Sequence, residues 1–185
     1  MGGAGGHGRV VVESNEPVYH AAWEGRVHGM ARRLLGAGLF NLDEFRDAQE
    51  RLPREQYLRS SYYERWLAAL EILVNETGAA VPDERAPESY ASAVFRPGER
   101  VVAKNVDPSG HTRLARYVRG KRGVVESVHG PSKLPDTNAR RLSRDWEPVY
   151  TVVFEAGELW GPRSEANGRV SIDLWQSYLE REGDP

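Results

Sequence analysis

The amino-acid sequence predicts an α+β protein with a helical N-terminal domain followed by a small antiparallel β-barrel. Two patterns lead to this fold class. Residues 17–78 carry large apolar side chains at the three- and four-residue spacings of amphipathic helices. Residues 95–185 instead contain short runs of β-branched and aromatic residues, separated by segments rich in Gly, Pro and Asp. Several short strands in a segment of this length favour an antiparallel barrel over a parallel sheet.

Three helices are expected in the N-terminal part, at residues 17–38, 41–53 and 61–78. Two of them have a sequence signature in their first turn. Asn41 is followed three residues later by Glu44, and Ser61 by Glu64, and these are the residue types that cap helix N-termini. Glycine or proline follows the apolar stripe of each helix, so the pattern also predicts where each helix ends.

The chain is expected to have four parts. Residues 1–16 are Gly-rich and polar, which predicts an extended arm, and residues 17–78 form the helical domain. Residues 79–94 combine prolines and charges with few large apolar side chains, as a linker does. Residues 95–185 form the β-barrel domain. Strands are expected there at residues 101–103, 123–128, 149–154 and 170–174.

The composition excludes several kinds of chemistry and location. The chain has 25 Lys and Arg against 27 Asp and Glu, a net charge of −2, and no Cys. It therefore cannot form a disulfide, a thiolate nucleophile or a thiolate metal site. No run of about 18 apolar residues occurs, and the first residues lack the basic and apolar segments of a signal peptide. We expect a cytoplasmic protein that does not enter a membrane.

No short motif in the chain defines an active site. Residues 3–8 match G-x-G-x-x-G, but this fingerprint binds a pyrophosphate only between a strand and a helix, and we expect a flexible arm here instead. The five histidines lack metal-ligand spacing, and no G-x-S-x-G elbow is present. Ordinary core or surface roles are expected for the histidines, although His111, between Gly110 and Thr112, has a more unusual setting.

A basic segment offers one alternative function. Residues 96–122 carry a net charge of +6, whereas the remaining chain carries −8. A basic β-barrel of this kind could bind nucleic acid through the phosphates. The same cluster could instead be a solvated face, or could place arginines in a protein interface, where their planar donors are favoured.

Aromatic side chains are concentrated on the third expected helix. Tyr62 and Trp66 are four residues apart and lie on one side, whereas Tyr63 and Leu67 lie on a neighbouring side. Core packing is the default role of such a stripe, but two adjacent stripes exceed what a small helical domain can bury. The pattern indicates a partner that covers one side of this domain.

Ordered segments in both halves of the chain resemble the β subunit of nitrile hydratase. They include Leu42-Asp43-Glu44-Phe45-Arg46 and Gly110-His111-Thr112-Arg113, and the ordered set is more specific than any single motif. The matching segments are residues 15–19, 23–24, 40–46, 50–52, 57–58, 62–66, 95–101, 110–113, 116–121, 135–137, 150–152, 158–161, 173–175 and 178–180. Thiocyanate hydrolase and toyocamycin nitrile hydratase subunits look similar, but they divide these halves between two chains.

The resemblance implies a fold, a reaction and a partner. The C-terminal barrel would be SH3-like, and the chain would pair with an α subunit as an αβ heterodimer or an α2β2 assembly. The α subunit would hold Co(III), which the Trp at position 66 favours, or Fe(III), in a loop of cysteines of which two are oxidised. The enzyme would be a lyase that adds water to a small-molecule nitrile to give an amide. Nucleic acid is not expected as a partner, and an assembly or metal-delivery factor is a further alternative.

The resemblance also implies the roles of six residues. Two arginines of the family hydrogen-bond to the oxidised cysteines, and a tyrosine hydroxyl lies near the metal. By motif, these catalytic residues are Arg46, Arg113 and Tyr62, and the substrate-binding residues are Leu42, Phe45 and Trp66. A guanidinium offers two charge-assisted donors in a fixed fork, which suits a sulfenate or sulfinate. From spacing alone, Arg46 would instead form a surface pair with Glu50, four residues on.

Overall fold

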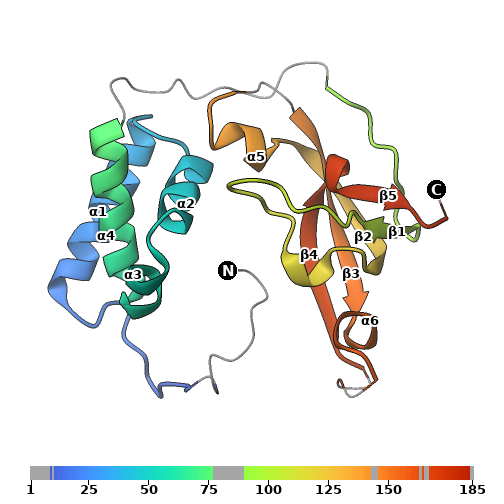
Figure 1. The fold of residues 1–185 in the computed structure, drawn as a ribbon, viewed down its shortest axis with the longest axis horizontal. Helices are drawn as coiled ribbons and strands as arrows, with labels where there is room; N and C mark the ends of the chain where they lie inside the picture. The colour runs from blue at the N-terminus through green and yellow to red at the C-terminus, as the bar shows by residue number, and fades with distance from the viewer. Residues whose placement is uncertain are drawn as a thin grey trace. The chain divides into compact units, whose positions relative to one another are not determined.

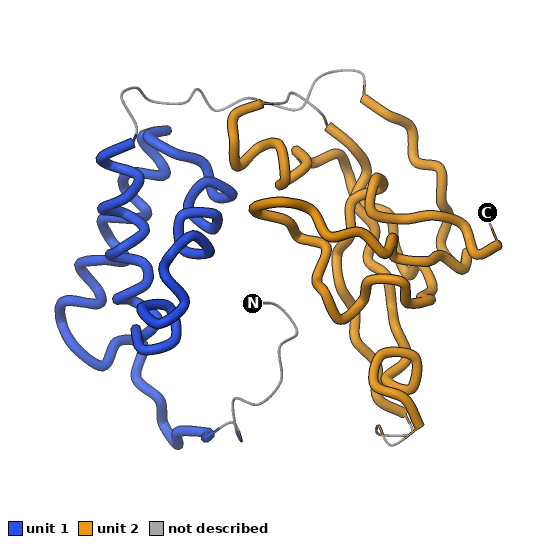
Figure 2. Tube along the Cα trace, viewed as in Figure 1, with its two compact units in different colours: residues 1, 3–84 blue, residues 2, 85–185 orange. Residues whose placement is uncertain are grey.

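The computed structural model describes residues 9, 11–76, 90–142, 146–162, 164 and 167–183. The chain divides into two compact units, one of residues 1 and 3–84 and the other of residues 2 and 85–185 (Figure 2). The long helices belong to the first unit and the strands to the second (Figure 1). The expected arm at 1–16 is described only at 9 and 11–16, and the expected linker at 79–94 only at 90–94. The G-x-G-x-x-G match at 3–8 lies outside the described residues.

The first unit consists of helices around a small apolar core. The helices are α1 (Ala22–Gly36), α2 (Leu42–Glu50), α3 (Arg54–Arg59) and α4 (Tyr62–Glu76). Both α1 and α2 pack against α4. The buried residues are Val27, Ala31, Phe40, Phe45, Ala48, Ala69, Leu70 and Leu73. The prediction of three helices is confirmed, but it missed α3, none of whose six residues is buried, so no apolar stripe marks it.

Both predicted capping boxes are confirmed. The Asn41 side chain accepts hydrogen bonds from the backbone N–H groups of Asp43 and Glu44, at 3.0 and 2.9 Å. The Glu44 carboxylate accepts the Asn41 backbone N–H at 2.7 Å, and Glu64 accepts that of Ser61 at the same distance. The caps fix the first residues of α2 and α4, which are Leu42 and Tyr62.

The second unit contains a five-stranded antiparallel sheet of order β4-β3-β2-β1-β5. Its strands are β1 (Arg100–Ala103), β2 (Arg122–Lys133), β3 (Trp146–Glu155), β4 (Arg169–Trp175) and β5 (Leu179–Arg181). The four predicted strands are confirmed. The prediction missed β5, because three residues are too few to show an alternation. The helical pieces are α5 (Pro135–Asn138), α6 (Ala156–Trp160), η1 (Arg116–Val118) and η2 (Gln176–Tyr178).

The sheet is not closed by the strand pairs of the described residues, so the α+β class is confirmed but a closed barrel is not. Its core includes the fully buried side chains of Tyr150, Phe154 and Leu174. Two irregularities in the register of β2 and β3, at Val125/Ser127 and His129/Pro131, bend the long hairpin. No helix within the described ranges is long and apolar enough to span a membrane.

Gly123 of β2 lies where the neighbouring strand β3 leaves no room for a Cβ atom. A Cβ atom at this position would lie 2.6 Å from Val152 Cγ1 and 3.0 Å from both Phe154 Cε1 and the Val153 carbonyl oxygen. We expect Gly123→Ala to destabilise the protein by about 1–3 kcal/mol, because the core and the backbone must shift. The measurement is the free energy of unfolding in urea.

Gly130→Ala is the matched control for this substitution. Gly130 is also in β2, but a Cβ atom there would meet nothing within 4 Å. The control should therefore stay within about 0.5 kcal/mol of the parent chain. Equal unfolding free energies for the two variants would show that the close approach at Gly123 is not a constraint.

Candidate functional site

The first turns of α2 carry three of the residues predicted for the site. Leu42, Phe45 and Arg46 lie on one side of the helix, because they are three and four residues apart. Phe45 is buried, whereas Leu42 is 46% exposed and the Arg46 side chain is 35% exposed. Side chains of different depth therefore share this face of α2.

The start of α4 places Trp66 against this face. The Trp66 ring contacts Phe45 edge-on, with centroids 5.0 Å apart, and Tyr62 at 5.4 Å. Trp66 is half-buried, but Tyr62 is 58% exposed. Leu42, Phe45, Arg46, Tyr62 and Trp66 are called the α2/α4 surface below. The structure thus places five of the six predicted site residues on two helices that pack together.

Arg46 forms an ion pair with a carboxylate on its own helix. Its Nη1 atom lies 3.2 Å from Asp43 Oδ1, and the Asp43 side chain is only 12% exposed. Arg46 thus pairs with the residue three positions before it, whereas its spacing had suggested a pair with Glu50, four positions after it. The contact holds one edge of the guanidinium, and a third of the side chain remains exposed.

Arg113 belongs to the second unit and lies in the loop between β1 and η1. Its side chain is exposed, but its backbone N–H donates to the Tyr178 hydroxyl at 3.3 Å. The Thr112 hydroxyl donates to the same oxygen at 3.4 Å, and Tyr178 in turn donates to Asp136. One phenol oxygen therefore joins the loop that carries Arg113 to α5 and η2.

Burial and the hydrogen bond to Asp136 raise the pKa of the Tyr178 hydroxyl well above its usual range. Sequence reasoning included Tyr178 and Asp136 in matching segments but gave them no role. They are 42 residues apart, so no local pattern connects them. The neighbouring His111 side chain, noted for its setting in the sequence, is buried with 1% exposure.

Some arginines of the basic segment at 96–122 have acidic partners. Arg100 and Arg122 both pair with Glu182, at 2.5 and 3.1 Å, and Arg119 pairs with Asp107. A depression of about 740 Å³ on the sheet is lined by residues of both signs. These are Arg100, Arg122, Arg169, Glu126, Glu155 and Glu158. Such mixed charge does not favour binding to the phosphates of a nucleic acid.

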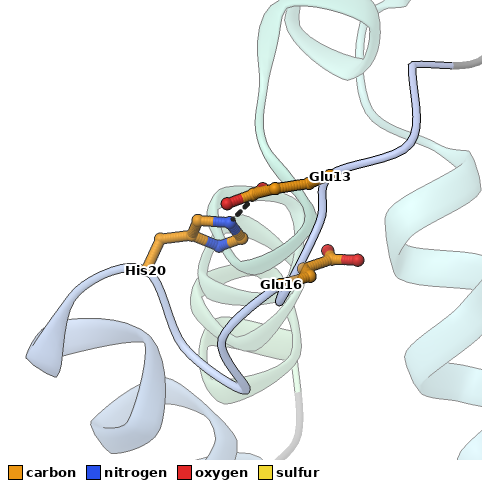
Figure 3. Close-up of side chains that lie close together, drawn as sticks. All are labelled: Glu13, Glu16 and His20. Carbon is orange, nitrogen blue, oxygen red and sulfur yellow. Dashed lines mark hydrogen bonds and ion pairs between the residues drawn. The ribbon is translucent and has the colours of Figure 1, made fainter.

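A group of possible metal ligands lies at the start of the first unit (Figure 3). Ligand atoms of Glu13, Glu16 and His20 lie within 4.8 Å of one another, and all three residues are exposed. His20 Nε2 lies 3.0 Å from Glu13 Oε2, and this hydrogen bond is the main cause of the raised pKa of His20. The group has oxygen and imidazole donors but no thiolate, so it differs from the cysteine site implied by the resemblance.

Comparison with known proteins identifies the family. The profile of the nitrile hydratase β subunit, N-terminal, matches residues 1–107, and that of the nitrile hydratase β subunit, C-terminal, matches residues 82–181. The low-molecular weight cobalt-containing nitrile hydratase subunit beta of Rhodococcus rhodochrous is 35% identical, over 97% of this chain and 96% of that one. The nitrile hydratase subunit beta of Pseudomonas putida is 36% identical over the same shares.

A more distant relative links the chain to a second enzyme. The thiocyanate hydrolase subunit alpha of Thiobacillus thioparus is 28% identical over 47% of this chain and 71% of that one. These matches define the class of the chain as a subunit of a heteromeric enzyme. The chain belongs to the nitrile hydratase β-subunit family.

Tyr178→Phe tests the network around Arg113. At pH 7 the variant should be less stable by about 1–3 kcal/mol, because Asp136, Thr112 and the Arg113 N–H lose a buried partner. The folded-state pKa of Tyr178 is raised above the ordinary value of 10.0. The stabilisation of the folded state by the protonated Tyr178 hydroxyl is therefore complete below pH 10. It decreases as the pH rises toward the folded-state pKa of Tyr178. The difference in the free energy of unfolding between the parent chain and Tyr178→Phe should therefore become smaller above pH 10.

The measurement is urea unfolding at several pH values between 7 and 11, with Tyr117→Phe as the control. The Tyr117 ring stacks on Trp160 in the same unit, so this control removes a hydroxyl outside the network. The raised pKa of Tyr178 would be contradicted if the parent and Tyr178→Phe differed in unfolding free energy by the same amount at pH 7 and at pH 11.

Proposed function

We propose that this chain, as a β subunit of nitrile hydratase, completes the active site by applying the α2/α4 surface to the α subunit. The supporting observation is the composition of that surface. It exposes aromatic, aliphatic and guanidinium groups together, and such groups are favoured where one protein covers another. The reaction is the hydration of a nitrile to an amide.

The α2/α4 surface has the side chains to bind the organic group of a nitrile. Leu42, Phe45 and the Trp66 ring provide an apolar wall, which excludes water from the bound substrate. Phe45 and Trp66 meet edge-on, so their relative orientation is fixed by packing. The exposed Tyr62 hydroxyl is the polar group of this wall and can donate a hydrogen bond to the reacting group.

The donor set of this chain fits a metal held by the partner. The sequence contains no Cys, so the cysteine ligands of a Co(III) or Fe(III) centre must come from the α subunit. The resemblance favours cobalt, because cobalt-type members of the family more often have Trp at the position of Trp66. A relative that is 35% identical is also named as cobalt-containing. Bound in the α subunit, the metal would supply Lewis-acid activation of the nitrile or of water.

Arg46 and Arg113 would donate hydrogen bonds to the oxidised cysteine oxygens of the α subunit. Asp43 holds one edge of the Arg46 guanidinium and leaves the other N–H groups available as donors. Arg113 is anchored through its backbone N–H, and its side chain is exposed. Charge-assisted donors of this kind hold an anionic sulfur oxygen in one position.

Two finer features belong to the same proposal. The bent sheet of the second unit would be an SH3-like barrel, as the resemblance implies. The chain and the α subunit would form an αβ heterodimer or an α2β2 assembly.

Arg46→Lys and Arg113→Lys test the donor role. Each change keeps the positive charge but removes the two-pronged donor geometry. In the complex with the metal-loaded α subunit, we expect kcat to fall by about 10–100-fold, with subunit association and metal content unchanged. The measurement is amide formation from a simple nitrile, alongside the mass and metal content of the purified complex.

Arg59→Lys is the control for these arginine variants. Arg59 is on α3, its side chain is 82% exposed, and it lies 4.0 Å from Glu55. Its replacement should leave kcat within about twofold, because an exposed pair contributes little. Full activity in both Arg46→Lys and Arg113→Lys would remove these arginines from the active site.

Trp66→Ala and Tyr62→Phe test the apolar wall. Trp66→Ala should raise KM for an aromatic nitrile by about tenfold or more, because it removes much of the apolar contact. Tyr62→Phe should lower kcat instead, because only the hydroxyl is lost. The measurement is steady-state kinetics with benzonitrile and acetonitrile at constant metal content. Unchanged kinetics for both variants and both nitriles would exclude this surface from the substrate pocket.

A further inference from the structure

A polar pair lies within the aromatic cluster behind the α2/α4 surface. The Tyr19 hydroxyl and His28 Nδ1 are 2.6 Å apart, which is a short hydrogen bond. Tyr19 precedes α1, and His28 lies in the middle of α1. Both side chains are half-buried, so this bond is only partly open to competition from water.

The Tyr19 ring lies beside Gly25 of α1. A Cβ atom at Gly25 would lie 3.4 Å from Tyr19 Cδ2, so the tyrosine ring packs directly against the helix at this residue. His28 is three residues further along the same side of α1. The contact with the helix at Gly25 and the hydrogen bond to His28 therefore place Tyr19 along one side of α1.

The imidazole of His28 in turn contacts the wall of the proposed pocket. Its ring is edge-on to Trp66, with centroids 5.7 Å apart and an interplanar angle of 89°. Tyr63 joins the same group, at 5.6 Å from Trp66 and 5.7 Å from Tyr19. Trp66 is thus held by α2 through Phe45 and by α1 through His28.

The hydrogen bond determines how the imidazole is presented to Trp66. An imidazole without a partner can turn about its side-chain bonds, whereas one bonded at Nδ1 is held in one orientation. A perpendicular contact between two rings is favourable only while both keep their orientation. Loss of the Tyr19 hydroxyl would therefore loosen Trp66 without removing any ring from the cluster.

We propose that Tyr19 and His28 are positioning residues that fix the Trp66 ring and thereby determine the preference of the enzyme for aromatic over small aliphatic nitriles. This inference rests on the proposed function, because it requires Trp66 to line the substrate pocket. Neither residue contacts the reacting atoms. The pair affects the shape of the apolar wall. The binding of a substrate with a flat aromatic ring depends on that shape more than the binding of a substrate with a methyl group does.

The test is a double-mutant cycle of Tyr19→Phe, His28→Phe and the double variant, in the complex with the metal-loaded α subunit. Each single variant should raise KM for benzonitrile by about 3–10-fold, the equivalent of one lost hydrogen bond, with kcat unchanged. KM for acetonitrile should change by less than about twofold. The double variant should show no larger effect than either single variant, because all three lack the same bond.

Tyr57→Phe is the matched control. Tyr57 is on α3, and its ring contacts Arg65 through a cation–π interaction that the substitution retains. This variant should leave KM for both nitriles unchanged. Thermal unfolding of every variant is measured in parallel, since a merely structural role would lower stability and kcat for all nitriles together.

The outcomes separate this inference from the proposed function. If Trp66→Ala raises KM for benzonitrile but Tyr19→Phe and His28→Phe do not, the positioning role is wrong and the pocket assignment stands. Effects of the single variants that multiply in the double variant would also overturn the inference, because they would then arise from two separate contacts. If Trp66→Ala has no effect on either nitrile, the pocket assignment is wrong and the inference fails with it.

Discussion

The packing of the Trp66 ring is the interaction on which the geometry of the α2/α4 surface depends. This side chain lies between Phe45 of α2 and His28 of α1, and it is joined by Tyr62 and Tyr63 of its own helix. Aromatic rings in contact from three helices allow few alternative arrangements, because each ring must keep a perpendicular or tilted contact with its neighbours. The helical unit therefore offers a preformed wall rather than an adaptable one.

In the second unit, a polar network rather than a group of packed rings holds the side chains in one arrangement. The Tyr178 oxygen accepts hydrogen bonds from Thr112 and the Arg113 N–H and donates to Asp136. Every donor in this group has a partner, so the network holds its loop in one conformation, and losing one member leaves the others unsatisfied. A chain without cysteine supplies no thiolate ligand, so in the proposed complex this network would contribute by holding Arg113 in place.

The sequence predicted the features that depend on neighbouring residues. The caps at Asn41 and Ser61 follow from side-chain chemistry within one turn, and the shared face of Leu42, Phe45 and Arg46 follows from helical spacing. Helix α3 and strand β5 were missed because neither has a buried alternation long enough to recognise. The Tyr178–Asp136 and Tyr19–His28 bonds join residues 42 and 9 positions apart, and only the folded chain brings them together.

The two arginines show why residue type alone does not define a site. Arg46 lies against the nearly buried Asp43, which aims the guanidinium and also neutralises part of its charge. Arg113 instead has an exposed side chain on a loop whose backbone is anchored to Tyr178. In the proposed complex, Arg46 would be a donor of fixed direction and Arg113 a donor whose direction can adjust. An adjustable donor can absorb small differences in docking between two proteins, whereas a fixed donor selects one geometry.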